Sequence, residues 1–219
     1  MTPLHPEAPA FALFDVDGTL TRGDTFIPFL RRVAGSRVVA SAFGRVIIAT
    51  LTGITGSRQD VKEMLTATLS GRTATEVETA GREHAQWIFQ HYLRRSIAKR
   101  LAEHRAHGSL VILVSASLRP YIAPLGELLG AHDVVCTDLE MRDSTVTGRL
   151  SGVNCRGREK VTQVAKRFGD IWPQSVAYGN GKGDRAMLEA AAVGYRVGPM
   201  GTIRLVATQP ALGEAGEAH

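Results

Sequence analysis

Residues 11–20 read Phe-Ala-Leu-Phe-Asp-Val-Asp-Gly-Thr-Leu, and this stretch decides the fold. The apolar run at 11–14 predicts a short strand that is buried on both faces, as in a parallel sheet. Asp15 and Asp17 follow where the strand ends. Ligand sites in open α/β sheets lie outside the carboxyl ends of the strands, and Gly18 lets the backbone turn close to a ligand. The stretch therefore predicts a site built on two carboxylates.

Two acids one residue apart suit phosphoryl transfer. Side chains at i and i+2 of a strand point the same way, so Asp15 and Asp17 are expected to start on one side. One carboxylate can attack a phosphorus atom, and the other can transfer protons. The two repel unless a cation lies between them, and Mg²⁺ prefers oxygen ligands. The alternative is an ordinary strand end, with one acid on the strand and the other in the turn. The complete string Asp-Val-Asp-Gly-Thr-Leu after an apolar strand favours a catalytic site instead.

The string Asp-Val-Asp-Gly-Thr-Leu resembles the first signature of the haloacid dehalogenase superfamily. Later stretches resemble its phosphoserine-phosphatase-like branch, subfamily IB. The resemblance implies an α/β fold, a doubly wound parallel-sheet core with an inserted all-helical C1-type cap. It also implies that Asp15 is the nucleophile and that Asp17 is the general acid/base, with its backbone carbonyl on Mg²⁺. Gly18 and Thr19 are assigned to phosphate binding by the same resemblance.

Composition narrows the function classes. The chain has 219 residues, 44% of them hydrophobic, and a formal net charge of +5, so a core domain with an insert is expected. The basic residues form no dense run with interleaved aromatics, which argues against nucleic-acid binding. Cys136 and Cys155 match no metal or redox spacing and are expected to be reduced thiols of a cytoplasmic protein. No signal peptide is recognised at residues 1–9.

The alternation of apolar runs predicts the domain organisation. Residues 1–22 and 99–208 are expected to form the α/β catalytic core, 23–98 the helical cap and 209–219 a flexible tail. The cap is predicted as helices near 26–33, 38–51 and 58–69, followed by one long or two broken helices over 75–104. The core elements are predicted as strands at 110–114, 133–137, 175–178 and 195–197, a hairpin over 139–150, and helices at 118–129, 158–168 and 185–192.

Two further parts of the site come from the second half of the chain. The strand at 110–114 ends in Ser115-Ala116-Ser117, so Ser115 and Ala116, with the free N–H groups of a helix beginning near Ser117, are expected to hold phosphate oxygens; Ser117 itself is predicted to cap that helix. Lys160 lies at the start of a helix, where the dipole disfavours a cation, so an anion should offset it, and a phosphate together with the Asp15 carboxylate would do so. The alternative is that Lys160 is a solvated surface lysine. The stretch around Lys160 resembles the third family signature, which favours a place for Lys160 in the phosphate site.

The loop Gly179-Asn180-Gly181-Lys182-Gly183-Asp184 resembles the fourth signature. Family members commonly have Asp at both ends, and here the first is Asn180. Asn180 still offers a carbonyl oxygen to Mg²⁺, but one negative charge is lost. Asp184 remains open between a metal ligand through water, a support for Lys160 and a helix cap.

Substrate recognition is the least determined part. Asp24 either contacts a substrate amino group or caps the helix that follows, and Arg58 is the candidate partner for a substrate carboxylate. The preferred function is a Mg²⁺-dependent phosphomonoester hydrolase with an aspartyl-phosphate intermediate, acting on a small organic phosphate such as phosphoserine. One alternative is a lipid-phosphate phosphatase, of the phosphatidylglycerophosphate kind, with the apolar segment 38–54 of the cap lying on a membrane; the other interpretation of that segment is a core helix. A second alternative, based on Asn180, is a catalytically weak binding protein. Stable membrane insertion is not expected, and the oligomeric state is undetermined.

Overall fold

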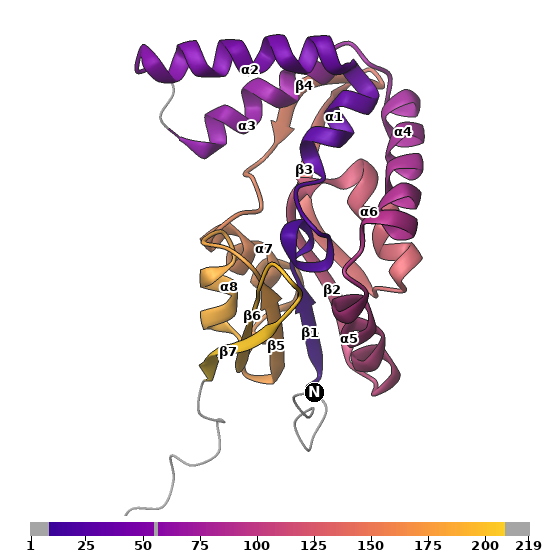
Figure 1. Ribbon diagram of the computed structural model, residues 1–219, viewed down its shortest axis with the longest axis vertical. Coiled ribbons are helices and arrows are strands. Elements are labelled where there is room, and N and C mark those ends of the chain that lie inside the picture. Colours follow the sequence, from indigo (N-terminus) through magenta and orange to yellow (C-terminus); the bar gives the residue numbers. More distant parts are fainter. Residues whose placement is uncertain (1–8, 55–56, 209–219) are drawn as a thin grey trace, which may run out of the picture.

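A seven-stranded sheet lies at the centre of the computed structural model, which describes residues 9–54 and 57–208 (Figure 1). Within those residues the strand order is β4-β3-β2-β1-β5-β6-β7. The strands are β1 (Phe11–Phe14), β2 (Leu110–Leu118), β3 (Asp133–Arg142), β4 (Thr145–Ser151), β5 (Ser175–Gly179), β6 (Val193–Val197) and β7 (Ile203–Thr208). The five strands β3-β2-β1-β5-β6 run parallel, and β4 and β7 are added antiparallel at the edges. The predicted α/β fold is confirmed.

The central strand β1 is buried on both faces, as its apolar sequence predicts. Ala12 and Phe14 belong to the core on one side of the sheet, and Leu13 belongs to the core on the other. Phe14 also stacks on Tyr178 of the neighbouring strand β5, with ring centroids 4.6 Å apart. Because β1 pairs with β2 and β5 in parallel, the residues after these strands reach the same edge of the sheet.

Helices cover both faces of the sheet. Helices α5 (Arg95–Ala106) and α6 (Arg119–Leu129) pack on the Phe14 side, and α7 (Arg158–Phe168) and α8 (Arg185–Ala190) contribute to the Leu13 side. No helix among the described residues is both long and apolar enough to cross a membrane.

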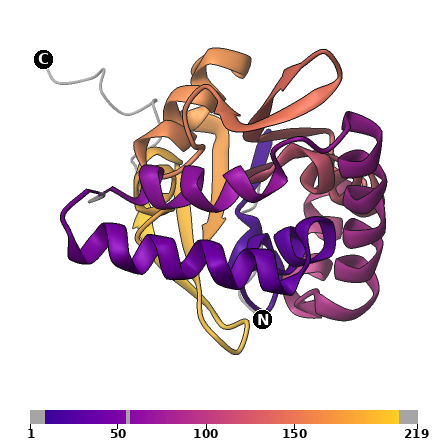
Figure 2. The same cartoon turned by 90° about the horizontal axis from the view of Figure 1, so that it is seen from above.

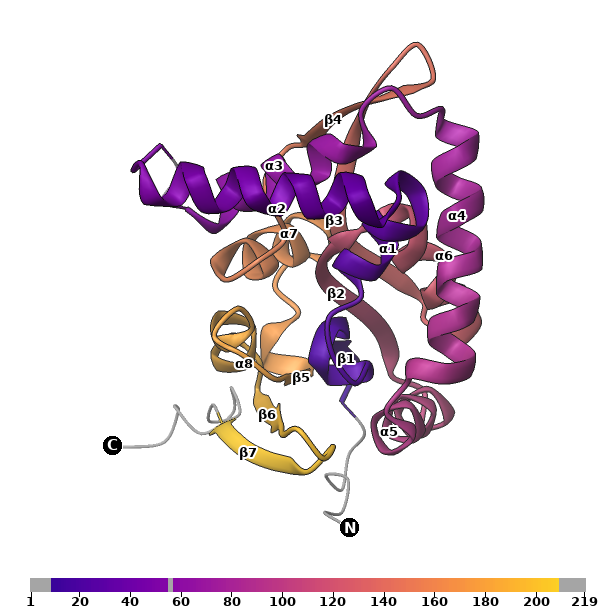
Figure 3. The same cartoon turned by 45° about the horizontal axis from the view of Figure 1, so that its top comes forward.

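A group of helices stands over the carboxyl ends of the strands (Figures 1 and 3). It contains α1 (Phe26–Ala34), α2 (Ser36–Leu51), α3 (Arg58–Thr66) with a short 3₁₀ turn (Ala67–Leu69), and α4 (Ala74–Trp87), which continues into a π turn (Ile88–Tyr92). Seen from above, α2 and α3 lie side by side across the top of the sheet (Figure 2). Helix α4 packs closely on α6, since a Cβ added at Gly81 would lie 2.0 Å from the carbonyl oxygen of Pro120.

Several predicted boundaries are wrong. Strand β2 does not end at Val114: after a register shift it continues to Leu118, which still pairs with Thr137 of β3. Helix α6 therefore starts at Arg119, and Ser117 does not cap it. The strand at 133–137 and the first arm of the hairpin form the single strand β3. Of the two alternatives for 75–104, the broken helix is the one observed, because the chain leaves helical geometry at Leu93. Strand β7, which was not predicted, is an edge strand with exposed Leu205 and Val206.

Candidate active site

A cavity of about 580 Å³ lies between the strand ends and the helices above them. The core lines it with Asp15, Asp17, Lys160, Asn180 and Asp184, which are all among the residues predicted from the sequence. The overlying helices line it with side chains from the end of α2 and from α3, Thr50, Val61, Lys62 and Leu65 among them. Four segments that are distant in the sequence thus meet in one place.

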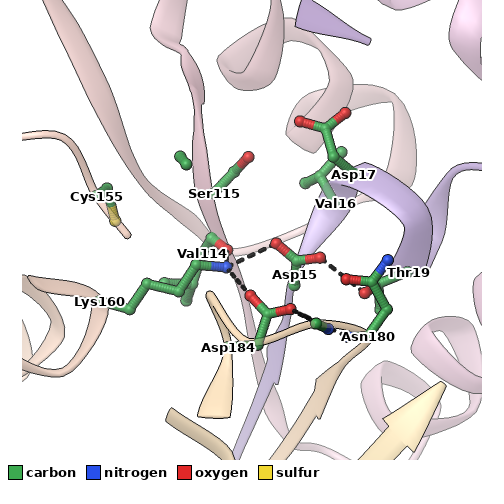
Figure 4. A network of polar contacts seen from close by, with 12 residues as sticks. Asp15, Val16, Asp17, Thr19, Val114, Ser115, Cys155, Lys160, Asn180 and Asp184 are labelled. Carbon is green, nitrogen blue, oxygen red and sulfur yellow. Dashed lines mark hydrogen bonds and ion pairs between the residues drawn. The ribbon is translucent and has the colours of Figure 1, made fainter. Parts of the chain in front are cut away.

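Asp15 lies at the end of β1, and its N–H donates to the carbonyl oxygen of Tyr178 (2.9 Å). Its carboxylate is buried: Oδ1 accepts a hydrogen bond from the Lys160 ammonium (2.6 Å) and Oδ2 accepts one from the Thr19 hydroxyl (2.7 Å) (Figure 4). Burial raises the pKa of Asp15 to about 7, although the neighbouring ammonium opposes the shift. The carboxylate is held in one orientation by two donors.

Lys160 is buried at the centre of the network, only 1% exposed. Its Nζ donates to Asp15, to Asp184 Oδ1 (2.7 Å) and to the carbonyl oxygen of Val114 (2.8 Å), so all three of its donors are used. Burial disfavours its charge, but the two carboxylates outweigh that effect and raise the pKa of Lys160. The surface-lysine alternative is therefore wrong.

Asp17 faces away from Asp15, toward the helices above (Figure 4). Its Oδ1 accepts hydrogen bonds from the N–H (2.8 Å) and hydroxyl of Thr25, and its Oδ2 accepts one from the Ser117 hydroxyl. The i, i+2 rule for strands does not apply here because the chain turns after Asp15, with Gly18 at φ +76°. The two carboxylates line one cavity with different partners.

The loop after β5 supplies Asn180 and Asp184. The Oδ2 of Asp184 accepts from the N–H groups of Asn180 and Gly181 (3.0 Å each), while its Oδ1 binds Lys160. Asp184 makes no side-chain cap on α8, so the cap alternative is wrong and the support for Lys160 is observed. Asn180 is exposed, and its amide lies against the turn at Gly18, where an added Cβ would be 2.0 Å from Asn180 Nδ2.

The residues expected to hold phosphate have protein partners of their own. The Ser115 hydroxyl is fully buried and accepts a hydrogen bond from the Ser117 N–H (3.0 Å). Ala116 lines the cavity, and its carbonyl oxygen accepts from the Thr137 hydroxyl (2.8 Å). The Thr19 hydroxyl donates to Asp15.

The two proposed substrate contacts differ. Asp24 is exposed and lines the cavity, and its Oδ2 accepts from the N–H of Ile27 (3.0 Å), so the capping role at the start of α1 is present. The side chain of Arg58 lies outside the described part of the structure.

Lys62 and Arg156 are cavity residues that sequence reasoning did not assign. The Lys62 ammonium, from α3, donates to the carbonyl oxygen of Ala116 and lies 4.7 Å from the ring centroid of Phe26. Burial lowers the pKa of Lys62 to about 8, and nearby Asp17 and Asp24 oppose this. The Arg156 guanidinium lies against Gly183 and has no hydrogen-bonding or ionic partner among the described residues.

The signals for these two residues were weak. Lys62 follows Val61 on an amphipathic helix and reads as an outer-face charge, because nothing local shows that the helix lies over a cavity. Arg156 belongs to the stretch that resembles the third signature, and its spacing of four residues from Lys160 was the only available indication.

The donors at this site are oxygen atoms. The Asp15 carboxylate, the Asn180 amide and the Asp17 main-chain carbonyl belong to the two loops that meet at Gly18 and line the cavity. No group of three or more His, Cys, Asp or Glu side chains that could hold a metal occurs among residues 9–54 and 57–208. The close approach of Asn180 to Gly18, which only a residue without Cβ permits, leaves its amide at the turn that carries Asp17. An oxygen-only set fits Mg²⁺ and not a soft metal.

Comparison with known proteins agrees with this geometry. The profile of the haloacid dehalogenase-like hydrolases matches residues 12–189. The chain is 33% identical over 195 residues to the protein CicA of Caulobacter vibrioides, covering 86% of each chain. It is 31% identical to the phosphoserine phosphatase SerB2 of Mycobacterium tuberculosis, covering 89% of this chain and 46% of that one. A solved structure of a phospho-aspartyl intermediate analogue of phosphoserine phosphatase superposes with a TM-score of 0.59 at 20% identity, covering 84% of each chain.

The fold and the family match define a hydrolase of the α/β class with a buried aspartate at the end of its central strand. The chain belongs to the haloacid dehalogenase-like hydrolases. The predictions of this family and of a phosphoserine-phosphatase-like phosphatase are confirmed by these matches.

Proposed function

We propose that the protein is a Mg²⁺-dependent phosphomonoester hydrolase that acts through an aspartyl-phosphate on Asp15. The supporting observation is the buried Lys160 ammonium, which bridges Asp15 and Asp184 at the wall of a 580 Å³ cavity. A charge that costs so much to bury is consistent with a site that must bind a phosphate dianion next to a carboxylate nucleophile.

The first half of the proposed reaction transfers the phosphoryl group. An oxygen of Asp15 attacks the phosphorus, a new P–O bond forms, and the bond to the ester oxygen breaks. Asp17 donates its proton to the departing alcohol. Thr25 and Ser117 hold Asp17 in place for this transfer. The hydrogen bonds from Lys160 and Thr19 orient Asp15 for the attack.

The second half releases the phosphate. Asp17 takes a proton from a water molecule, whose oxygen attacks the phosphorus and frees Asp15 together with inorganic phosphate. When bound by Asp15, Asn180 and the Asp17 carbonyl, Mg²⁺ would supply positive charge that offsets the charge of the phosphoryl oxygens. Asp184 acts through Lys160 and the loop N–H groups rather than through direct coordination. Gly18, Thr19, Ser115 and Ala116 complete the proposed phosphate site.

The helical segment 23–98 is proposed as a cap that supplies substrate contacts. Lys62 from this cap and Arg156 from the core place two cations in the cavity beyond Asp15, and Arg156 adds to burial in lowering the pKa of Lys62. The Lys62 and Arg156 cations are suited to bind a second anionic group on the leaving alcohol. The Asp24 carboxylate is suited to bind an amino group. Phosphoserine has both groups, and the name of the SerB2 relative supports it as the default substrate. Arg58 stays a candidate partner for a substrate carboxylate. A cytoplasmic location is part of the same proposal.

A lipid phosphate is the second candidate substrate. It is favoured by the exposed apolar residues at the end of α2, which lie next to cavity residue Thr50. Asn180 takes the place of an acidic residue at the proposed metal site, so a catalytically weak binding protein is a third outcome that the test must distinguish.

The test is hydrolysis of a panel of phosphate esters by the full chain, with and without Mg²⁺. Asp15→Asn is the matched variant, because it keeps the size of the side chain and removes the nucleophile. We expect Mg²⁺-dependent release of phosphate from phosphoserine that Asp15→Asn abolishes. Turnover of lipid phosphates without phosphoserine would select the second candidate. Binding of phosphate esters without any turnover would overturn the enzymatic proposal.

A further inference from the structure

The positive charge of this protein is concentrated in one part of the cap. Between Asp24 and Asp60 the chain has no acidic residue and no lysine, but it has five arginines, Arg31, Arg32, Arg37, Arg45 and Arg58. Residues 25–59 thus carry a formal charge of +5, which equals the net charge of the whole chain. The other 21 basic and 21 acidic residues cancel.

The same part of the cap exposes large apolar side chains. Ile47, Ile48, Leu51 and Ile54, at the end of α2 and just beyond it, are 59%, 61%, 82% and 80% exposed. The opposite face of the helix packs inward through Val39, Ala42, Val46 and Ala49, which are buried.

Arginine and apolar residues share the outer face of α2. At 3.6 residues per turn, Arg37, Gly44, Ile48 and Leu51 follow one another along one side, at steps of about two turns and then one. Arg45 lies beside this row, and both arginines are exposed. Neither Arg37 nor Arg45 has an ion-pair partner among the described residues. We call the exposed set Arg37, Arg45, Ile47, Ile48, Leu51 and Ile54 the α2 face.

The α2 face lies at an outer surface next to the cavity. Helix α2 runs along the end of the molecule opposite the start of β1 in Figure 1, so a flat surface can approach it without obstruction from the sheet. Thr50 and Ser57, which flank the apolar end of the helix, line the cavity. The end of α2 that carries the exposed apolar residues therefore also borders the cavity.

The chemistry of the face selects the partner. Helix α2 is about 24 Å long, shorter than the roughly 30 Å hydrocarbon core of a bilayer, so it cannot span. A helix with apolar residues on one face and arginines around them suits the interface between acyl chains and headgroups. Unpaired arginines attract anionic headgroups. We propose that the α2 face docks the protein on an anionic lipid surface.

The experiment is flotation of the full chain with vesicles of phosphatidylcholine alone and with about 30% phosphatidylglycerol. We expect binding to the anionic vesicles that weakens in about 0.5 M NaCl, where screening is strong. The double variant Arg37→Gln/Arg45→Gln should lower the partition coefficient about fivefold for each arginine removed. Leu51→Ser with Ile48→Ser should abolish binding, because the apolar contact is lost.

Met200→Ser is the matched control, since Met200 is 89% exposed but lies in the loop between β6 and β7 and not on α2. Circular dichroism and urea unfolding should show that all variants fold. Failure to bind anionic vesicles, or equal losses in the Met200→Ser control, would overturn the proposal. So would a dimer in gel filtration that Leu51→Ser dissociates, because the face would then belong to a second copy. The readout is binding, so it does not depend on the proposed reaction.

Discussion

Replacing Lys160 with methionine is the sharpest test of the site. The change keeps the length of the side chain and removes the ammonium that contacts Asp15 at 2.6 Å and Asp184 at 2.7 Å. At these distances each attraction amounts to about 6 kcal/mol for an effective dielectric of about 20, before desolvation is counted. Removing one partner of a buried ion pair costs about 3–5 kcal/mol, because the remaining charge is left uncompensated. We expect Lys160→Met to lose about that much in the free energy of unfolding at pH 8.

The pH dependence of this variant distinguishes lost charge from lost packing. Without Lys160 the two buried carboxylates repel each other, so one of them should bind a proton at a pH well above its ordinary pKa. The folded variant then holds more protons than the unfolded chain between about pH 4 and that raised pKa. Because the pKa of Asp15 in the folded wild type is about 7, the wild type also holds this proton below that pH. The stability of the variant relative to the wild type should therefore fall as pH rises above about 7, and the deficit should be smaller at pH 5 than at pH 8.

Urea unfolding at pH 5 and pH 8 measures both quantities. Lys166→Met is the control, since Lys166 is exposed on the same helix and should change stability by less than about 0.5 kcal/mol. A loss below about 1 kcal/mol for Lys160→Met, or a loss that does not vary with pH, would refute the reasoning. Phosphatase activity of the variant should be abolished in either buffer.

Three other predictions concern the loops and the core. Gly18→Ala should abolish activity because the new Cβ would lie 2.0 Å from Asn180 Nδ2. The control Gly35→Ala, with a similar φ of +87° and no atom within 4 Å of the new Cβ, should keep activity. Equal activity in the two variants would contradict the contact between Gly18 and Asn180. Asn180→Asp should lower the Mg²⁺ concentration for half-maximal activity at least about tenfold, since one charge about 4 Å from the ion is worth about 4 kcal/mol at an effective dielectric of about 20; an unchanged requirement would exclude Asn180 as a ligand. Burial lowers the pKa of His84 and His104 to about 4 from 6.5, so the unfolded chain gains protons first and stability should fall by about 3 kcal/mol per histidine as pH drops from 7 to 4. Urea unfolding of His104→Phe should show a shallower fall than that of the exposed-site control His91→Gln, and identical profiles would argue against this origin.

Structural features that depend only on residues near one another in the sequence could be predicted. The run at 11–14 is apolar at every position, and a strand with two buried faces requires this. The acids that follow it mark the strand end, and the family resemblance identified the loops that contribute Lys160 and Asp184. The cap helices were also predictable, since their apolar residues repeat with the helical period. The end of β2 was not, because Ser-Ala-Ser reads as a loop unless the pairing of Leu118 with Thr137 is known.

The sequence by itself determined a parallel α/β core and the acids at the end of its first strand, because apolar periodicity and abrupt charge are local properties of the chain. Only the tertiary structure decided which partners those acids have. Lys160 reaches Asp15 across 145 residues, and Ser117 reaches Asp17 across 100. The same is true of Lys62, whose ammonium lies at the carbonyl of Ala116 although its own helix reads as an ordinary amphipathic surface helix. Burial and pairing of these charges arise from packing between distant segments, so no local pattern records them.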